Sequence, residues 1–493
     1  MRTEPETKGS RTLVRGGHLF DLDRPFEVGD LLIDDGAIAR VGGRIEAAGA
    51  RVIDAAGMIV MPGLINAHTH SNQSIEKGLC DALPLDAWMV VASYGGAGAA
   101  LGPKDLYVST MVGALEMLTT GTTSVLDCPR SPQQWFDEGM DQIMSAYVDV
   151  GMRANVAAQY SDLDFFDSLP MALINEERPR ARTGTVPELL ARVEPFLERW
   201  QGRHPRLQPM LGPSSLPRCS VELFKASLDL AARRGVGLHT HLLSAKSQVP
   251  VAGARYGGST VDFLREIGGL RKSTSFAHAI WLDDREIDLL AASESGVVHN
   301  PVSNLKLGAG VAPVPAMLRA GVSVALGTDG ASSNDSQNMF ETLKAAALVQ
   351  RPIVPQDRWP TAMDSLRMCW DGGARTLSKK IGRLDPGFRA DIVLLRTGDL
   401  RLAPKQQIAN QLVYAELGRS VDTVLVDGDV VVRGGRVTKV DAETVQADAQ
   451  RLIDGIWSSL PARDARFAEV SPTLERLERE VRALALGFSR FCD

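Results

Sequence analysis

The stretch MPGLINAHTH, from Met61 to His70, decides how the rest of the chain is interpreted. It is an apolar run that ends in His-x-His, which is typical of a buried strand whose last residues leave the sheet. Alternate residues of a strand point to the same side, so His68 and His70 are expected to face one way. Two imidazoles on one face are half of a candidate metal site, although packing alone also produces this pattern.

Downstream of this stretch, strand-like runs alternate with segments of helical spacing, which indicates a parallel α/β sheet. The runs are LINAH (64–68), TTSVLD (122–127), RANVAAQ (153–159), LQPMLG (207–212), VGLHTH (236–241), TSFAHA (274–279), GVVHN (296–300) and VSVALGTD (322–329). Most of the segments between them have apolar residues at helical spacing, and several end at glycine. Eight runs of this kind predict a closed (β/α)8 barrel, the TIM-barrel architecture.

Both ends of the chain carry short strands and turn signals instead. Asp35-Gly36 near the N-terminus and Asp427-Gly428 near the C-terminus are hairpin signals. Neither end has enough strands to cover a hydrophobic face alone, so we expect one small β-sandwich built from both termini. The predicted division is 1–61 and 384–440 for the sandwich, 62–383 for the barrel, and 441–493 for a charged helical segment on the surface or at a subunit contact.

Composition narrows the classes of function. The 54 basic and 60 acidic side chains give a formal net charge of -6, so the chain shows no basic footprint for nucleic acid. A polar N-terminus and the lack of any long apolar run predict neither a signal peptide nor a membrane span. Cysteine numbers 5, without CxxC spacing, which argues against a disulfide scaffold and suits a reducing compartment. We expect a cytoplasmic protein with a small-molecule partner.

Polar residues stand at the ends of the predicted barrel strands. They are His68 and His70 on the first run, His241 on the fifth, His278 on the sixth and Asp329 on the eighth. A barrel builds its active site at these carboxyl ends, so imidazoles and one acid from separate strands converge there. This convergence predicts a catalytic metal centre. A hydrogen-bond network without metal is the alternative.

Weaker candidates surround this set. His239 precedes His241 by two residues, so we expect it deeper in the barrel as a packed, hydrogen-bonded side chain. Ser303 and Asn304 follow the seventh strand and are candidate substrate contacts, with ordinary turn chemistry as the equal alternative. Trp88 in LPLDAWM is a candidate pocket wall, and simple packing is its alternative.

The segments PGLINAHTH, LHTH, FAHAIWLDD, HNPVSNLKLGAG and GTDGASSND together resemble the amidohydrolase superfamily. They are similar to the ATZ/TRZ branch, which contains atrazine chlorohydrolase, the triazine hydrolases, cytosine- and guanine-type deaminases and adenosyl-homocysteine deaminases. The resemblance implies a distorted barrel with a flanking β-sandwich, in agreement with the strand pattern. It also implies a metal-dependent hydrolase of carbon–nitrogen bonds other than peptide bonds, in a homodimer or higher homo-oligomer.

The resemblance further implies residue roles. Members of the branch usually hold one divalent metal, commonly zinc and sometimes iron. By position, the ligands would be His68, His70, His241 and Asp329, and the catalytic pair would be His278 and Asp329, which accepts a proton from water. A non-catalytic scaffold is the alternative from another class of protein. Scaffold relatives are expected to have lost ligands, however, and this chain has each expected one.

Two departures from the branch bear on the substrate. Its nucleoside deaminases carry a ribose-binding glutamate after the Trp88 position, whereas VVASYGGAGAALGP contains no acid here, which favours a base-like or smaller heterocycle. Its deaminases usually have His-x-x-Glu where this chain has His241-Leu242-Leu243-Ser244. A serine hydroxyl has no useful acidity near neutral pH.

Ser244 is therefore assigned to substrate binding, and the proton donor must lie elsewhere or be unnecessary. The predicted reaction is hydrolysis of a carbon–nitrogen or carbon–leaving-group bond in a small nitrogen heterocycle by a metal-activated water. A plain aminohydrolase of a nucleobase-like, pterin or triazine substrate, with a nearby acid in place of the glutamate, is the alternative.

Overall fold

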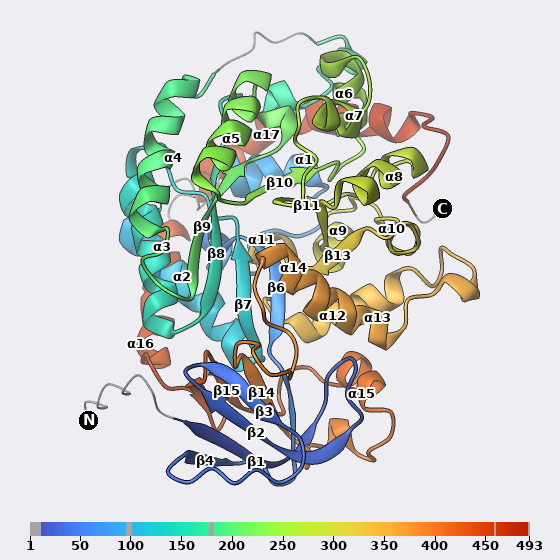
Figure 1. The fold of residues 1–493 in the computed structure, drawn as a ribbon. Coiled ribbons are helices and arrows are strands. Elements are labelled where there is room, and N and C mark those ends of the chain that lie inside the picture. Colours follow the sequence, from blue (N-terminus) through green and yellow to red (C-terminus); the bar gives the residue numbers. More distant parts are fainter. Residues whose placement is uncertain (1–10, 95–100, 177–181, 458–459, 492–493) are drawn as a thin grey trace.

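The computed structural model describes residues 11–94, 101–176, 182–457 and 460–491. Two sheets organise these residues, an 8-stranded sheet and a 9-stranded sheet. In Figure 1 the barrel forms the upper part of the molecule and the second sheet lies below it. None of the helices in these described ranges is long and apolar enough to cross a membrane.

All of the predicted barrel strands are present, and each pairs in parallel with the next along the chain. They are β6 (Leu64–Thr69), β7 (Thr122–Asp127), β8 (Arg153–Tyr160), β9 (Leu207–Pro213), β10 (Leu238–Leu242), β11 (Thr274–His278), β12 (Gly296–His299) and β13 (Ser323–Leu326). β6 and β7 are buried along their whole length, as parallel strands covered on both faces must be. The N–H of Asp329 donates to the carbonyl of His68 at 2.9 Å, which joins the last strand to the first. The predicted distorted barrel is confirmed.

Helices follow the strands and cover the barrel. The longer ones are α2 (Pro103–Thr119), α3 (Phe136–Val150), α4 (Val186–Trp200), α5 (Val221–Arg234), α6 (Gln248–Tyr256), α7 (Thr260–Glu266), α8 (Asp284–Ser293), α10 (Val314–Ala320) and α12 (Met339–Val349). The shorter ones are α1 (Leu85–Trp88), α9 (Pro301–Lys306), α11 (Ala331–Asn334), α13 (Ala362–Arg367) and α14 (Gly373–Leu377). A further helix, α15 (Ile408–Tyr414), lies between two strands of the second sheet in the chain. In α5, Ser220 caps the first turn and Gly235, with a φ of +64°, ends the helix.

The second sheet is built from both termini, as predicted. Its strands are β1 (Thr12–Leu19), β2 (Glu27–Asp34), β3 (Ala37–Val41), β4 (Arg51–Asp54), β5 (Met58–Pro62), β14 (Ile392–Arg396), β15 (Val421–Val426), β16 (Asp429–Arg433) and β17 (Arg436–Val437). β5 pairs with β14 in antiparallel fashion and joins the two halves. Asp35-Gly36 and Asp427-Gly428 form tight hairpin turns with positive φ at both residues.

The C-terminal segment contains α16 (Ala442–Trp457) and α17 (Leu460–Ala483). α17 crosses the end of the barrel that faces away from the second sheet (Figure 1). Its Leu474, Leu477 and Val481 pack against Ala87 and Phe165, which belong to segments above the strand ends. The segment is therefore more than a charged surface helix, because three apolar side chains at helical spacing bury one of its faces.

Candidate active site and metal centre

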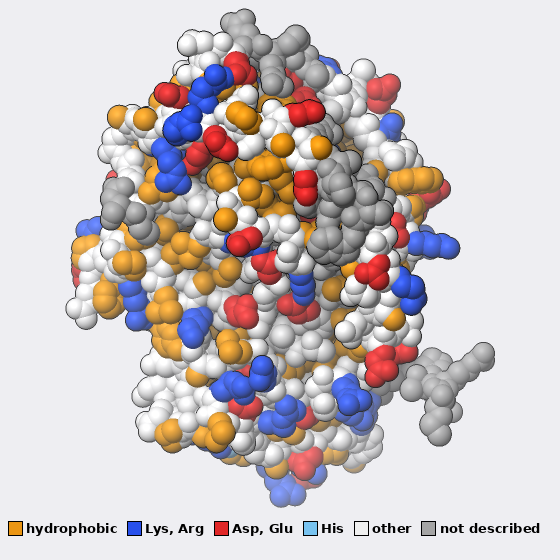
Figure 2. Space-filling model, turned by 180° about the vertical axis from the view of Figure 1, so that it is seen from behind, with side chains coloured by type: hydrophobic (Ala, Val, Ile, Leu, Met, Phe, Trp, Pro, Cys, Tyr) orange, Lys and Arg blue, Asp and Glu red, His pale blue; other side chains and the backbone are white. Residues whose placement is uncertain are grey.

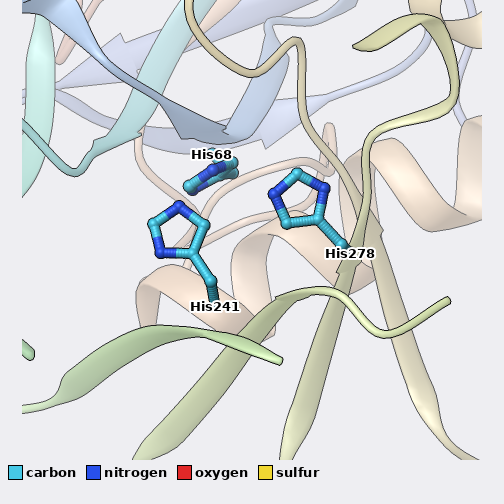
Figure 3. A group of neighbouring side chains, drawn as sticks. All are labelled: His68, His241 and His278. Carbon is cyan, nitrogen blue, oxygen red and sulfur yellow. The ribbon is translucent and has the colours of Figure 1, made fainter. Parts of the chain in front are cut away.

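The predicted ligand residues converge at the carboxyl ends of the barrel strands. The Nε2 atoms of His68 and His70 lie 3.4 Å and 3.3 Å from Oδ1 of Asp329. Nε2 of His241 lies 3.3 Å from Nε2 of His70, and Nε2 of His278 lies 3.9 Å from Oδ2 of Asp329. Figure 3 shows the rings of His68, His241 and His278 arranged around one space.

The outer nitrogens of two of these rings are held by backbone carbonyls. Nδ1 of His70 donates to the carbonyl of Cys128 at 2.6 Å, and Nδ1 of His241 donates to that of Ser214 at 2.6 Å. Each carbonyl fixes the proton on Nδ1 and leaves the lone pair of Nε2 directed at the centre. This is the arrangement in which histidine binds a metal.

His68 is held differently, by a second histidine. Its Nδ1 lies 2.8 Å from Nε2 of His239, whose own Nδ1 lies 2.7 Å from the hydroxyl of Ser275. His239 is fully buried below the centre, as its register on β10 predicts. The structure adds what the sequence did not indicate, namely that His239 orients a candidate ligand.

The remaining two members of the centre are fixed by α9, the short helix that follows β12. Oδ1 of Asn304 accepts a hydrogen bond from Nδ1 of His278 at 2.8 Å, and Ser303 donates to Oδ2 of Asp329 at 2.6 Å. His278 and Asp329 have φ values of 73° and 63°, in the left-handed region that non-glycine residues rarely adopt. Backbone of this kind is typical of active sites, where the surrounding structure holds it in place.

The electrostatics suit a divalent metal. Burial lowers the pKa of His68 to about 4 and also lowers the pKa values of His70 and His241, so these rings are neutral at pH 7. Burial would raise the pKa of Asp329, but the neighbouring imidazoles outweigh it and hold that pKa well below its usual value. Neutral imidazoles and one carboxylate are the donors of a catalytic zinc site.

One atom shows that the centre is built to hold something. Nε2 of His68 is buried and has no hydrogen-bond partner among the described residues. Its ligand atom and those of His70 and Asp329 lie within 4.8 Å of one another, as do those of His68, His241 and His278. A divalent metal satisfies this atom, so the residues present fit such an ion.

A cavity opens above the centre. The side chains that line it come from α1, from the loops after the strands and from the centre itself: His70, Gln73, Leu85, Asp86, Trp88, Met89, Gln159, Phe165, Ser168, Ser214, Ser215, Arg218, His241, Ser244, Ser247, Gln248, His278 and Asp329. Trp88 and Ser244 thus lie where a substrate would contact them. Ser303 and Asn304, predicted to contact substrate, are not among the described residues of the cavity wall, because their polar atoms face Asp329 and His278 from behind.

Sequence reasoning missed an acid in this wall. The comparison with nucleoside deaminases concerned the residues after Trp88. Asp86 instead lies two residues before Trp88, in the first turn of α1. The available signal was the acid in LPLDAWM. The role of this acid depends on the position of α1 relative to the cavity, which a sequence pattern does not predict.

A profile of the amidohydrolase family matches residues 59–431. The chain belongs to the amidohydrolase family. It is a hydrolase that acts on carbon–nitrogen bonds other than peptide bonds, with a divalent metal as its cofactor.

Relatives of this amidohydrolase include deaminases. It is 35% identical over 462 residues to a 5-methylthioadenosine/S-adenosylhomocysteine deaminase of Desulforudis audaxviator, covering 90% of this chain and 100% of the relative. It is 34% identical over 439 residues to a 5'-deoxyadenosine deaminase of Methanothermobacter thermautotrophicus, covering 89% of this chain and 97% of the relative.

Solved structures of zinc-bound enzymes have a similar fold. A zinc-bound adenosine deaminase of Xanthomonas campestris superposes with a TM-score of 0.81 and 27% identity, covering 91% of this chain and 99% of that one. A zinc-bound atrazine chlorohydrolase of Arthrobacter aurescens superposes with a TM-score of 0.81 and 28% identity, covering 90% and 100%.

Proposed function

We propose that this amidohydrolase is a zinc-dependent aminohydrolase, which replaces the exocyclic amine of a purine-like nitrogen heterocycle by oxygen. The observation that carries the proposal is the convergence of His68, His70, His241, His278 and Asp329, all of which except the fully buried His68 line one cavity. The relatives of highest identity reported above are deaminases of adenine nucleosides, and they support an amine as the leaving group.

In this proposal His68, His70, His241 and Asp329 hold the zinc. When bound, the zinc lowers the pKa of a water molecule to about 7 and so makes a nucleophile available at neutral pH. Asp329 accepts a proton of that water and passes it to the leaving amine. Nδ1 of His278 donates to Asn304, so its Nε2 is free to accept a hydrogen bond from the water and hold it in line.

The test is a substrate panel on zinc-loaded protein. 5'-Methylthioadenosine, 5'-deoxyadenosine, adenosine, guanine, cytosine and a pterin are followed for ammonia, and atrazine is followed for chloride. Ammonia from an adenine nucleoside or base, lost when a chelator removes the zinc and regained on its return, supports the proposal. Protein that binds well under one equivalent of metal and stays inactive with added zinc contradicts it.

Carbon–halogen hydrolysis is the second candidate. Ser244 offers no acid at the position after His241, and a halide leaves without being protonated. The likeness to a solved atrazine chlorohydrolase points the same way. Chloride release from atrazine that is faster than ammonia release from every amine on the panel would favour this reaction.

We also propose a cytoplasmic homodimer or higher homo-oligomer. The cysteines that the structure describes are buried, and Cys128, Cys219 and Cys369 form no disulfide with one another, which suits a reducing compartment. On the face shown in Figure 2, basic side chains are interspersed with acidic ones, and this agrees with a small-molecule partner. Light scattering at micromolar protein tests the assembly, and a mass near the 53.1 kDa of one chain would contradict it.

A further inference from the structure

Hydrolysis of a ring amine needs an acid as well as a nucleophile. Attack at the carbon pushes electrons onto the adjacent ring nitrogen, and a positioned acid that protonates this nitrogen typically speeds the reaction by about 10² to 10⁴. Ser244, beside the centre, has a hydroxyl that cannot serve, and it accepts a hydrogen bond from Gln248 at 2.9 Å. Another wall residue must supply the proton.

The described wall of the cavity contains two carboxylic acids, Asp86 and Asp329. Asp329 is fully engaged at the floor, since it accepts from Ser303 at 2.6 Å and from the N–H of Gly330 at 2.8 Å. Its Oδ1 also lies 3.3 Å from His70. Asp86 stands apart from this network, in the first turn of α1, and shares the cavity wall with Ser247, the residue that precedes α6.

We propose that Asp86 is the proton donor to the ring nitrogen of the substrate, a role that rests on the aminohydrolase function proposed above. Asp86 gives its proton to the nitrogen as the water oxygen bonds to the neighbouring carbon, while one water proton passes to Asp329. That proton goes on to the amine, which leaves as ammonia when the carbon–nitrogen bond breaks. The remaining O–H proton returns to Asp86 as the carbonyl forms, so atoms and charge balance.

The surroundings of Asp86 agree with this role. Burial raises the pKa of its carboxyl to about 6, Ser247 lowers it, and the charge of Glu478 on α17 raises it further. An acid of this strength is partly protonated near neutral pH, as proton transfer requires. The charged and titratable groups that share the cavity are Arg218, His70, His241, His278 and Asp329.

The first experiment is the pH dependence of kcat for zinc-loaded Asp86→Asn and wild type on the best amine of the panel. We expect kcat to fall by about 10² to 10⁴ in the variant. We also expect the decline of wild-type kcat above the pKa of this acid to disappear, because no group is left to deprotonate. Asp81→Asn, an exposed acid in the same segment, is the matched control. Zinc content and thermal unfolding verify that each variant is folded.

Two further variants separate proton donation from substrate binding. Glu478→Gln removes a charge that raises the pKa of Asp86, so the declining limb should move to lower pH. Ser244→Glu in the Asp86→Asn background places an acid on β10's loop, and a gain of tenfold or more in kcat over Asp86→Asn supports the proposal.

The proposal for Asp86 would be overturned if Asp86→Asn changed only KM or kept kcat within threefold of wild type. It would also be overturned if the high-pH decline of kcat did not move in Glu478→Gln. These results concern an active wild type and leave the proposed function intact. Wild type that releases no ammonia from any compound would instead refute the proposed function, and this role of Asp86 with it.

Discussion

His68 joins the metal centre to the interior of the barrel. One ring nitrogen faces the centre and has no hydrogen-bond partner among the described residues, and the other lies 2.8 Å from His239. Because an open catalytic site has few protein ligands to spare, His68→Ala, like the alanine variants of the other three ligands, should lose most of the bound zinc. Equilibrium dialysis followed by atomic absorption measures this.

His239→Ala is a subtler variant. From sequence alone, a packed His239 predicts no effect on metal binding, but its hydrogen bond to His68 changes the expectation to an affinity about 10- to 100-fold weaker. Competition with a chromophoric chelator gives the affinity. His204→Ala, in a loop after α4, serves as the control. A metal affinity of His239→Ala equal to that of wild type would show that the hydrogen bond of His239 does not help His68 to bind the metal.

The same burial makes metal-free protein sensitive to acid. His68 has a pKa of about 4 when folded and 6.5 when exposed, so the unfolded chain binds more protons between these values. The free energy of unfolding should therefore be highest above pH 6.5 and fall as the pH drops toward 4, by up to about 1.4 kcal/mol per pH unit for this residue. Urea unfolding of chelator-treated protein at pH 7 and pH 5 tests the sign. His68→Gln should show the smaller dependence.

How far the site could be predicted depends on what each residue contacts. His68, His70, His241, His278 and Asp329 were predictable because each stands at or just beyond the end of an apolar strand, and parallel strands bring their ends together. Ser303 and Asn304 were assigned to substrate from their place in a loop. Their contacts with Asp329 and His278 join residues 26 apart in sequence and depend on side-chain directions, which strand periodicity does not fix.

Among the elements, the barrel strands were the most predictable, since each is a short apolar run between turn signals. α17 was the least. Its helical spacing was visible, but its position over the barrel depends on contacts of Leu474, Leu477 and Val481 with the segments around Ala87 and Phe165, far earlier in the chain. Helical periodicity identifies an apolar face and not the surface that covers it.

Lys246 binds the C-terminal end of α17 through hydrogen bonds. Its Nζ donates to the carbonyls of Arg482 and Leu484 at 2.9 Å and 2.8 Å, and carbonyls at a helix C-terminus have no partner within the helix. We expect Lys246→Met to release the last turn of α17 and to speed amide hydrogen exchange there by tenfold or more. Lys225→Met, at an exposed position of α5, is the control. Exchange rates in residues 474–484 that match wild type would mean that apolar packing alone holds the helix.

At the scale of the whole molecule, the barrel and the second sheet are joined by a buried ion pair. Arg153, at the start of β8, donates through Nε to Asp391 at 2.7 Å and through Nη2 to Asp391 at 3.0 Å, and it also contacts Asp427. The hairpin signal at Asp427-Gly428 predicted a turn from sequence. The contact between Asp427 and Arg153 was not predictable from sequence. It arises because the pairing of β14 with β5 brings the turn at Asp427 close to the barrel.

Removing one partner of this pair should be costly. Arg153→Met leaves the Asp391 carboxylate buried with neutral donors, namely the hydroxyl of Ser124 at 3.1 Å and the backbone N–H of Asp427 at 2.8 Å. A buried charge without a charged partner typically destabilises by about 3–5 kcal/mol. Urea unfolding of zinc-loaded protein measures the loss. Arg265→Met breaks a surface pair with Asp262 and should cost less than about 1 kcal/mol.

The double variant Arg153→Met with Asp391→Leu should recover much of the stability, since it leaves neither charge alone. Arg153 lies at the amino end of β8, and barrels build their active sites at the opposite end of the strands. Zinc content and ammonia release per folded molecule should therefore stay at wild-type values in all three variants. A loss of zinc in Arg153→Met that exceeds its loss of folded protein would show instead that the junction of the two sheets sets the geometry of the metal centre.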